Sequence, residues 1–131
     1  MSKAGETFFT SVGCMDGRSE CTVAKWGRRK FGVEYADAIT EAGLVGLISN
    51  NPEQNLLDSI KKKILISLEK HNSKNIVVSG HEECAGNPVD NEKHKKDVFK
   101  TAGIIREMIP SARVISVFVK RQNKDWIVEE L

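Results

Sequence analysis

The chain has 131 residues, of which 40% are hydrophobic, 29% charged and 6% aromatic. These proportions are typical of one globular domain, and a domain of this length buries enough surface to fold without disulfide bonds. The formal net charge is only +2, which argues against a nucleic-acid partner because such binders concentrate positive charge. No apolar run approaches the about 18 to 20 residues that span a bilayer, and residues 1–6 lack the apolar stretch of a secretory signal. We therefore expect a single cytoplasmic domain over residues 1–131, with neither a membrane nor a nucleic acid as partner.

The first part of the chain contains two predicted strands. Residues 7–14 are β-prone and lead into a polar, glycine-containing loop. A helix is predicted from Ser19 to about Lys30, with Gly32 closing it. Residues 35–40 form a second strand of modest hydrophobicity, as found at a sheet edge, and residues 44–49 form one helical turn.

The rest of the chain alternates long helices with strands. A helix is predicted to run to about residue 72, with Asn51 as its N-cap and Pro52 as its first residue. Residues 75–81 have an uninterrupted apolar centre, which indicates a strand buried on both faces. Residues 91–109 form an amphipathic helix that turns Phe99 inward with the other apolar residues. A strand over 113–120, a turn and a short returning strand over 126–128 complete the series.

This alternation of strands and helices predicts the fold class. Parallel strands joined by helical crossovers are right-handed units that place helices on the faces of one open sheet. We expect a three-layer α/β/α domain whose mainly parallel sheet has the strand order 2-1-3-4. The last strand adds a short antiparallel edge at the C-terminus.

Two segments far apart in the sequence carry metal-ligand side chains at predicted strand ends. Cys14 ends the first strand, and His81 and Cys84 follow the buried strand with a His-x-x-Cys spacing. If these strands are neighbours, their carboxyl ends flank the usual ligand crevice of such sheets. Two thiolates and one imidazole suit Zn²⁺ with a fourth position open, as in catalytic sites. The alternatives are a redox pair formed by Cys14 and Cys84, or unreactive thiols.

Asp16 and Arg18 follow Cys14 at intervals of two residues. In an extended segment, alternate residues point to the same side, so all three side chains are expected to face one pocket. An Asp held by an Arg fork stays ionised and oriented, and it can accept a hydrogen bond from a metal-bound water. The alternative is a surface ion pair that only positions a loop.

The remaining cysteine and histidines lie outside these motifs. Cys21 is expected to be a buried or partly exposed free thiol, the alternative being the fourth ligand of a closed structural site. His71 at a helix end and His94 among lysines are both expected to face solvent. The two glutamates at positions 82 and 83 are expected to be solvated, although they lie close enough in sequence to touch the pocket.

A Cys-x-Asp-x-Arg motif followed by His-x-x-Cys after a Val-Val-x-Gly strand resembles the β-class carbonic anhydrases over most of the chain. The resemblance implies that Cys14, His81 and Cys84 bind zinc and that Asp16 and Arg18 form a catalytic dyad beside it. It implies reversible hydration of CO₂ to bicarbonate by a metal-bound hydroxide. It also implies that either Asp16 or water can hold the fourth zinc position.

The sequence departs from the family pattern at several positions. The first predicted strand starts about seven residues into the chain, so we expect no N-terminal helical arm. No Gln precedes Gln54, residues 40–43 match the family's Arg-Asn-Ala-Gly only in their last two positions, and Ala85 stands where the family commonly has Gly. Two alternatives therefore stay open: a zinc hydrolase of a CO₂ analogue such as carbon disulfide or carbonyl sulfide, and a non-catalytic zinc-binding or redox-sensing module. The weak edge strand and the resemblance together predict a homodimer or higher homo-oligomer.

Overall fold

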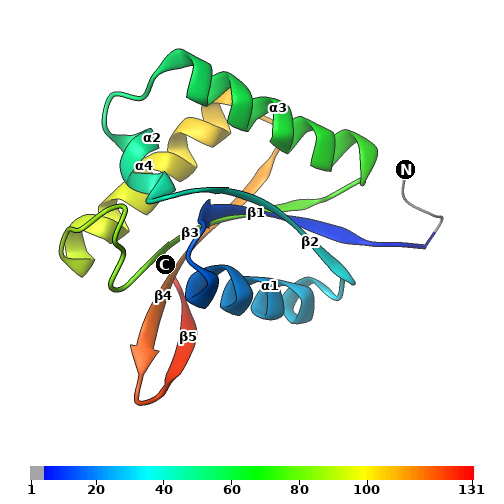
Figure 1. Ribbon diagram of the computed structural model, residues 1–131. Helices are drawn as coiled ribbons and strands as arrows, with labels where there is room; N and C mark the ends of the chain where they lie inside the picture. The colour runs from blue at the N-terminus through cyan, green and yellow to red at the C-terminus, as the bar shows by residue number, and fades with distance from the viewer. Residues whose placement is uncertain (1–4) are drawn as a thin grey trace.

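The computed structural model describes residues 5–131, which form one five-stranded sheet flanked by four helices (Figure 1). The elements in chain order are β1 (Phe8–Cys14), α1 (Gly17–Phe31), β2 (Tyr35–Glu41), α2 (Leu44–Ser49), α3 (Gln54–Lys70), β3 (Asn75–His81), α4 (Asn91–Met108), β4 (Arg113–Gln122) and β5 (Asp125–Glu130). Among the helices of this described range, none has the length and apolarity needed to cross a bilayer.

The strand order is β2-β1-β3-β4-β5. β1 pairs parallel with β2 and β3, β3 pairs parallel with β4, and β5 returns antiparallel to β4. The predicted fold class, the 2-1-3-4 order and the antiparallel C-terminal strand are therefore confirmed. β2 lies at the sheet edge as its modest hydrophobicity predicts, because an edge strand has less surface to bury.

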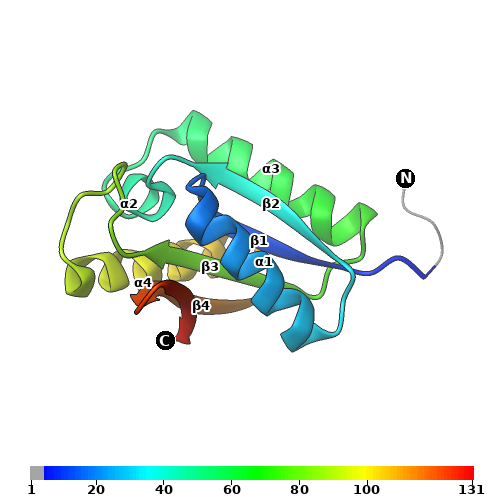
Figure 2. The same cartoon turned by 60° about the horizontal axis from the view of Figure 1, so that its bottom comes forward.

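The helices cover the two faces of the sheet unequally, with α2, α3 and α4 on one face and α1 alone on the other (Figures 1 and 2). The larger apolar cluster lies under the three helices and contains Val78 and Ile64, while the smaller one lies under α1 and contains Phe9. Phe8 and Phe9 face opposite sides of β1, since successive side chains of a strand alternate. Phe9 is fully buried, and Phe8 stacks on His71.

Two predicted helix starts are wrong. Helix α1 begins at Gly17 rather than Ser19, because Asp16 caps it. Helix α3 begins at Gln54 with Glu53 as N-cap, since Asn51 has φ 51° and forms a left-handed turn instead of capping the helix. The left-handed Gly32 that closes α1 was predicted correctly.

The inward face of α4 also differs from the prediction. Phe99 is 52% exposed, so its predicted inward position is wrong. The predicted Val98, Ala102 and Ile105 are buried, and the same face also contains three buried polar residues: His94, Asp97 and Thr101. Apolar periodicity missed these polar residues because it treats them as outward-facing, whereas Asp97 and Thr101 make buried hydrogen bonds.

Candidate metal centre

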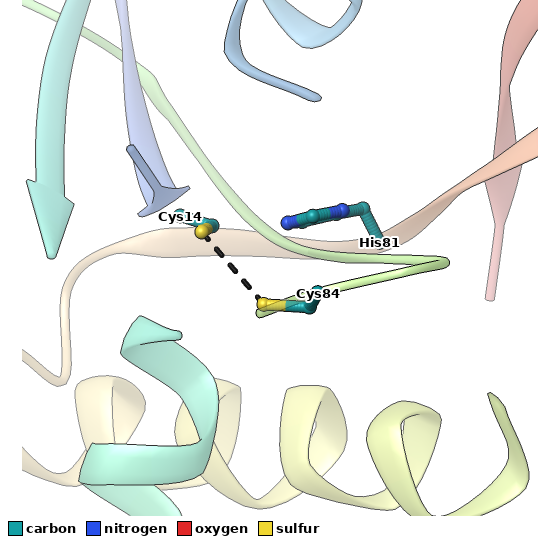
Figure 3. A group of neighbouring side chains, drawn as sticks. All are labelled: Cys14, His81 and Cys84. Carbon is teal, nitrogen blue, oxygen red and sulfur yellow. Dashed lines mark hydrogen bonds between the residues drawn. The ribbon is translucent and has the colours of Figure 1, made fainter. Parts of the chain in front are cut away.

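Cys14, His81 and Cys84 meet at the carboxyl ends of β1 and β3, where their side chains converge (Figure 3). One ligand atom from each residue lies within 4.8 Å of the other two. All three residues are buried, with exposed fractions of 8%, 0% and 6%. The sequence prediction that these residues come together is confirmed, because β1 and β3 are neighbours in the sheet.

The spacing of the two sulfurs suits a tetrahedral metal. The Sγ atoms of Cys14 and Cys84 lie 3.8 Å apart. A tetrahedral Zn²⁺ with Zn–S distances of about 2.3 Å requires its two sulfurs to be about 3.8 Å apart. The thiols therefore stand at the separation that one shared zinc ion would need.

The ring of His81 is oriented so that one nitrogen is left for a ligand. Nδ1 lies 2.8 Å from the carbonyl oxygen of Glu82, to which it donates, and this contact places the ring proton on Nδ1. Nε2 is buried and has no hydrogen-bond partner. A buried nitrogen with a free lone pair is costly unless something binds it, and a metal-ligating histidine typically holds its other nitrogen on a carbonyl in this way. The chain's own residues therefore fit a bound metal.

Backbone amides donate to both sulfurs. Gly43 N donates to Cys14 Sγ over 3.4 Å, and the amides of Asn87 and Gly86 face Cys84. Burial raises the pKa of the Cys84 thiol, the neighbouring Cys14 adds to the rise, and the two amides oppose it. A divalent cation reverses that balance, since a coordinating thiol is deprotonated outright.

Two glycines allow the loops that carry these amides to touch. Gly43 has φ 62°, and a Cβ there would clash with the backbone of Gly86. A Cβ at Gly86 would lie 2.6 Å from the carbonyl carbon of Ala42. Side chains are therefore excluded where the loop after β2 crosses the loop after Cys84. Gly43 is one of the two positions that match the family's Arg-Asn-Ala-Gly segment, and Gly86 follows Ala85, where the family commonly has Gly directly after the Cys.

Asp16 and Arg18 form a bidentate pair at the same edge of the sheet. Asp16 Oδ1 accepts from Arg18 N and Nε at 2.9 and 3.1 Å, and Arg18 Nη2 donates to Oδ2 over 2.8 Å. The predicted extended geometry is wrong, because Gly17 already begins α1 and Asp16 is its N-cap. The cap turn brings the two side chains together instead. The hydrogen bonds from the Arg18 side chain lower the pKa of Asp16 to about 2.

Arg18 also contacts the loop between His81 and Cys84. Its Nη2 donates to Glu83 O over 3.3 Å, and its Nη1 lies 3.7 Å from Glu83 Oε1. Glu83 is exposed as predicted, and it also forms an ion pair, because Arg121 Nε donates to its Oε2 over 2.8 Å and holds the pKa of Glu83 below the ordinary range. Glu82 is half-buried rather than fully solvated, and its carboxylate accepts a hydrogen bond from Arg121 N over 3.1 Å.

A hydrogen bond anchors the loop after Cys84 to α4. Asn87 Nδ2 donates to Asp97 Oδ2 over 3.0 Å, and Lys93 also pairs with this carboxylate. Asp97 is only 2% exposed. Sequence reasoning missed Asn87 and Asp97, although an Asp in the middle of an otherwise apolar helix stripe is the signal that points to a buried polar contact.

Both remaining histidines were placed wrongly in solvent. His94 is 2% exposed, lies over Gly80 and packs edge-on against Phe118. Burial lowers the pKa of His94 to about 4, so it is neutral at pH 7. His71 is half-buried, stacks on Phe8 at a ring separation of 3.9 Å, and its Nδ1 is 2.7 Å from Asp37 Oδ2.

Cys21 lies apart from the three candidate ligands. It is an exposed free thiol on α1 and does not belong to the group of potential ligand residues in the described part of the chain. The prediction of a free thiol is confirmed.

Comparisons with solved structures and with family models relate the chain to known proteins. A search of the curated proteins finds no match. Among solved structures, the chain is similar to β-carbonic anhydrase isoform I from Trichomonas vaginalis, at 15% identity and a TM-score of 0.56 over 98% of this chain and 86% of that one. It is also similar to the β-carbonic anhydrase CafD from Aspergillus fumigatus, at 11% identity and a TM-score of 0.59 over 98% and 91%.

A third similar structure comes from a report on two tetrameric β-carbonic anhydrases of Sordaria macrospora. Its identity is 16% and its TM-score 0.55, over 97% of this chain and 82% of that one. At these identities the likeness concerns the fold. The family model described as "Putative carbonic anhydrase" matches residues 4–131 of the sequence itself. The chain belongs to this carbonic anhydrase family.

Proposed function

We propose that this protein is a zinc-dependent carbonic anhydrase that catalyses the reversible hydration of carbon dioxide to bicarbonate. The observation that carries the proposal is the buried group of Cys14, His81 and Cys84, in which His81 Nε2 has no hydrogen-bond partner. Membership of the family supports the reaction, and the paired Asp16 and Arg18 at the same sheet edge support its catalytic machinery.

In this proposal the three buried residues hold Zn²⁺ and leave a fourth position open. Zn²⁺ in such a site supplies a Lewis acid that lets water act as a nucleophile near neutral pH. The chain's own contribution is to orient the three ligands beforehand. The His81 ring is fixed by Glu82 O, and the sulfurs receive backbone amides from the loops after β2 and β3.

Asp16 acts in the proposal as a fixed hydrogen-bond acceptor. With a pKa of about 2 it is ionised throughout the neutral range, so it is too weak a base to carry the reaction's proton. Arg18 holds both carboxylate oxygens and so keeps Asp16 on the arginine. The proton produced by hydration then passes to solvent buffer rather than to this side chain.

We also propose that residues 1–131 form one zinc domain that works in the cytoplasm as a homodimer or higher homo-oligomer. The β2 edge supports self-association, because an open strand edge offers unpaired backbone groups to a second copy. The similar Sordaria macrospora enzymes are described as tetrameric. Buried free thiols support a reducing compartment.

The test is stopped-flow CO₂ hydration with a pH indicator, on protein whose zinc content per chain is measured in the same preparation. We expect about one zinc per chain and turnover that disappears after chelation and returns when zinc is added back. One zinc per chain without turnover of CO₂ between pH 7 and 9 would overturn the carbonic anhydrase assignment. Assays with carbon disulfide and carbonyl sulfide would then separate an analogue hydrolase from a non-catalytic zinc-binding or redox-sensing module.

A further inference from the structure

The ion pair with Asp16 does not by itself fix the orientation of the Arg18 side chain. That side chain is 42% exposed, and an exposed ion pair between flexible side chains does not by itself fix one geometry. Yet the proposed function, on which this inference rests, requires Asp16 to be held in one orientation. The structure shows where that support comes from, because Glu83 and Trp126 contact the Arg18 guanidinium and Arg121 contacts both of them.

The first support is Glu83, which lies in the loop between His81 and Cys84. Glu83 has φ 60°, a left-handed conformation that is uncommon for residues other than glycine. The Nε and Nη2 of Arg18 face Asp16, and Nη1 faces Glu83 Oε1 at 3.7 Å. The carboxylates of Asp16 and Glu83 therefore face different nitrogens of the guanidinium, and Nη2 also donates to the backbone oxygen of Glu83.

The second support is Arg121 on β4, which fixes Glu83. Arg121 Nε donates to Glu83 Oε2 over 2.8 Å, and Arg121 Nη2 donates to Oε1 over 3.2 Å. Its backbone nitrogen also donates to Glu82 Oε2 over 3.1 Å. Arg121 thus links both glutamates of the loop between His81 and Cys84, the metal loop, to the sheet.

The third support is Trp126 on β5, which stands opposite Arg121 in the β4–β5 register. The guanidinium carbons of Arg18 and Arg121 lie 5.0 and 4.4 Å from the centre of its ring. Two cations can share one indole because the carboxylate of Glu83 lies between them and offsets their repulsion. The C-terminal hairpin therefore reaches the loop between His81 and Cys84 through Arg121 and reaches Arg18 through the Trp126 ring.

We propose that Glu83, Arg121 and Trp126 form a positioning cluster that holds Arg18 and, through it, the carboxylate of Asp16. None of the three needs to touch substrate. The cluster joins the loop after β1, the metal loop after β3 and the C-terminal hairpin. Loss of any member leaves Arg18 with fewer fixed contacts, so Asp16 samples more orientations beside the metal site.

The test compares Glu83→Gln and Trp126→Leu with Glu130→Gln as the matched control. Glu130 also forms an ion pair on the C-terminal hairpin, with Lys30, but it has no contact with the cluster in the described residues. We expect Glu83→Gln and Trp126→Leu to lower kcat for CO₂ hydration about tenfold with KM and zinc content unchanged, as is common when residues that orient metal-site groups are replaced. Trp126→Phe, which keeps an aromatic face, should restore most of the rate.

A second readout does not depend on activity. The Nε–H signal of Arg18 in a ¹H–¹⁵N spectrum of the zinc-loaded protein, assigned by its loss in Arg18→Lys, should exchange faster with solvent in both cluster variants and not in Glu130→Gln. Faster exchange in a protein that never hydrates CO₂ would support the cluster while the proposed function fails. Unchanged exchange and unchanged kcat in well-folded Glu83→Gln and Trp126→Leu would overturn the cluster.

Discussion

The Sγ atoms of Cys14 and Cys84 lie 3.8 Å apart, although the two residues are separated by 70 positions in the sequence. Their closeness follows from the strand order, since β1 and β3 are adjacent and parallel and so end at the same edge. His81 completes the group at the end of β3. The three residues are therefore held by the central strands of the sheet rather than by its margins.

Replacing Cys84 by Ser is expected to remove zinc. A serine hydroxyl does not ionise near neutral pH and is a much poorer zinc ligand than a thiolate. Zinc per chain, measured by elemental analysis after dialysis, should fall from about one to near zero. Cys21→Ser is the matched control and should keep its zinc, because Cys21 is exposed and outside the group. Full retention of zinc in Cys84→Ser would refute the assignment of this ligand.

Replacing Asp16 by Ala is expected to abolish turnover while leaving the metal in place. The variant loses the oriented acceptor but keeps Cys14, His81 and Cys84. We expect kcat/KM for CO₂ to fall by about 100-fold or more, within the usual range for a side chain that acts at the reacting centre. Stopped-flow rates and zinc content should be measured on the same preparation. An unchanged rate would count against the role of the pair with Arg18.

Replacing Gly43 by Ala is expected to destabilise the protein and weaken zinc binding. The new Cβ would clash with the backbone of Gly86, and the alanine would have to adopt the left-handed φ of 62°. Strain and overpacking of this kind cost about 2–4 kcal/mol in total. Gly103→Ala is the control, since nothing lies within 4 Å of a Cβ there, and alanine in mid-helix should add about 0.5–1 kcal/mol. Urea unfolding measures both, and equal effects of the two substitutions would contradict the packing argument.

Replacing Asp97 by Asn is expected to lower stability more at neutral pH than in acid. Burial raises the pKa of Asp97, but hydrogen bonds from Lys93, Asn87 and Ser49 outweigh burial and bring it below its ordinary value of 3.8. A lowered pKa means that the ionised form stabilises the fold above pH 3.8 and that this contribution is lost as the pH falls through the folded-state pKa.

Urea unfolding of Asp97→Asn and the wild type at pH 7 and pH 3 measures this contribution. We expect a difference of about 1–3 kcal/mol at pH 7 that shrinks at pH 3. Acid would release the proposed zinc from both proteins alike, so this effect cancels from the comparison. Asp58→Asn, which changes an exposed carboxylate, should show little difference at either pH. A pH-independent effect of Asp97→Asn would contradict the titration argument.

The fold and the three candidate metal ligands could be predicted from the sequence because both depend on long-range but regular features. The uninterrupted apolar run of residues 75–81 identified β3 as a central strand, and a central parallel strand must end at the same edge as its neighbour. Cys14, His81 and Cys84 follow from that topology. The pairing of Asp16 with Arg18 was also anticipated, although through an extended backbone that the structure replaces with a helix cap.

The residues around the site could not be predicted from the sequence, since their positions depend on contacts that leave no periodic signal. His94 and Asp97 are polar residues on a buried helix face, and only the tertiary structure shows what they pack against or bond. Arg121 and Trp126 come from the last hairpin, and their sequence gives no sign that it reaches the metal loop. Gly43 shows its importance only once Gly86 is seen beside it.

Asp16 has a second task, as the N-cap of α1, whose first turn it stabilises by accepting the amide of Arg18. The same carboxylate thus caps α1 and pairs with Arg18 beside the candidate metal ligands. Any rotation of Asp16 toward the thiols would uncap α1, at a cost of about 1 kcal/mol in the folded protein. The 15 residues of α1 are consequently coupled to the state of the site. Movement of this one side chain therefore carries the energetic cost of uncapping the helix that packs on this face of the sheet.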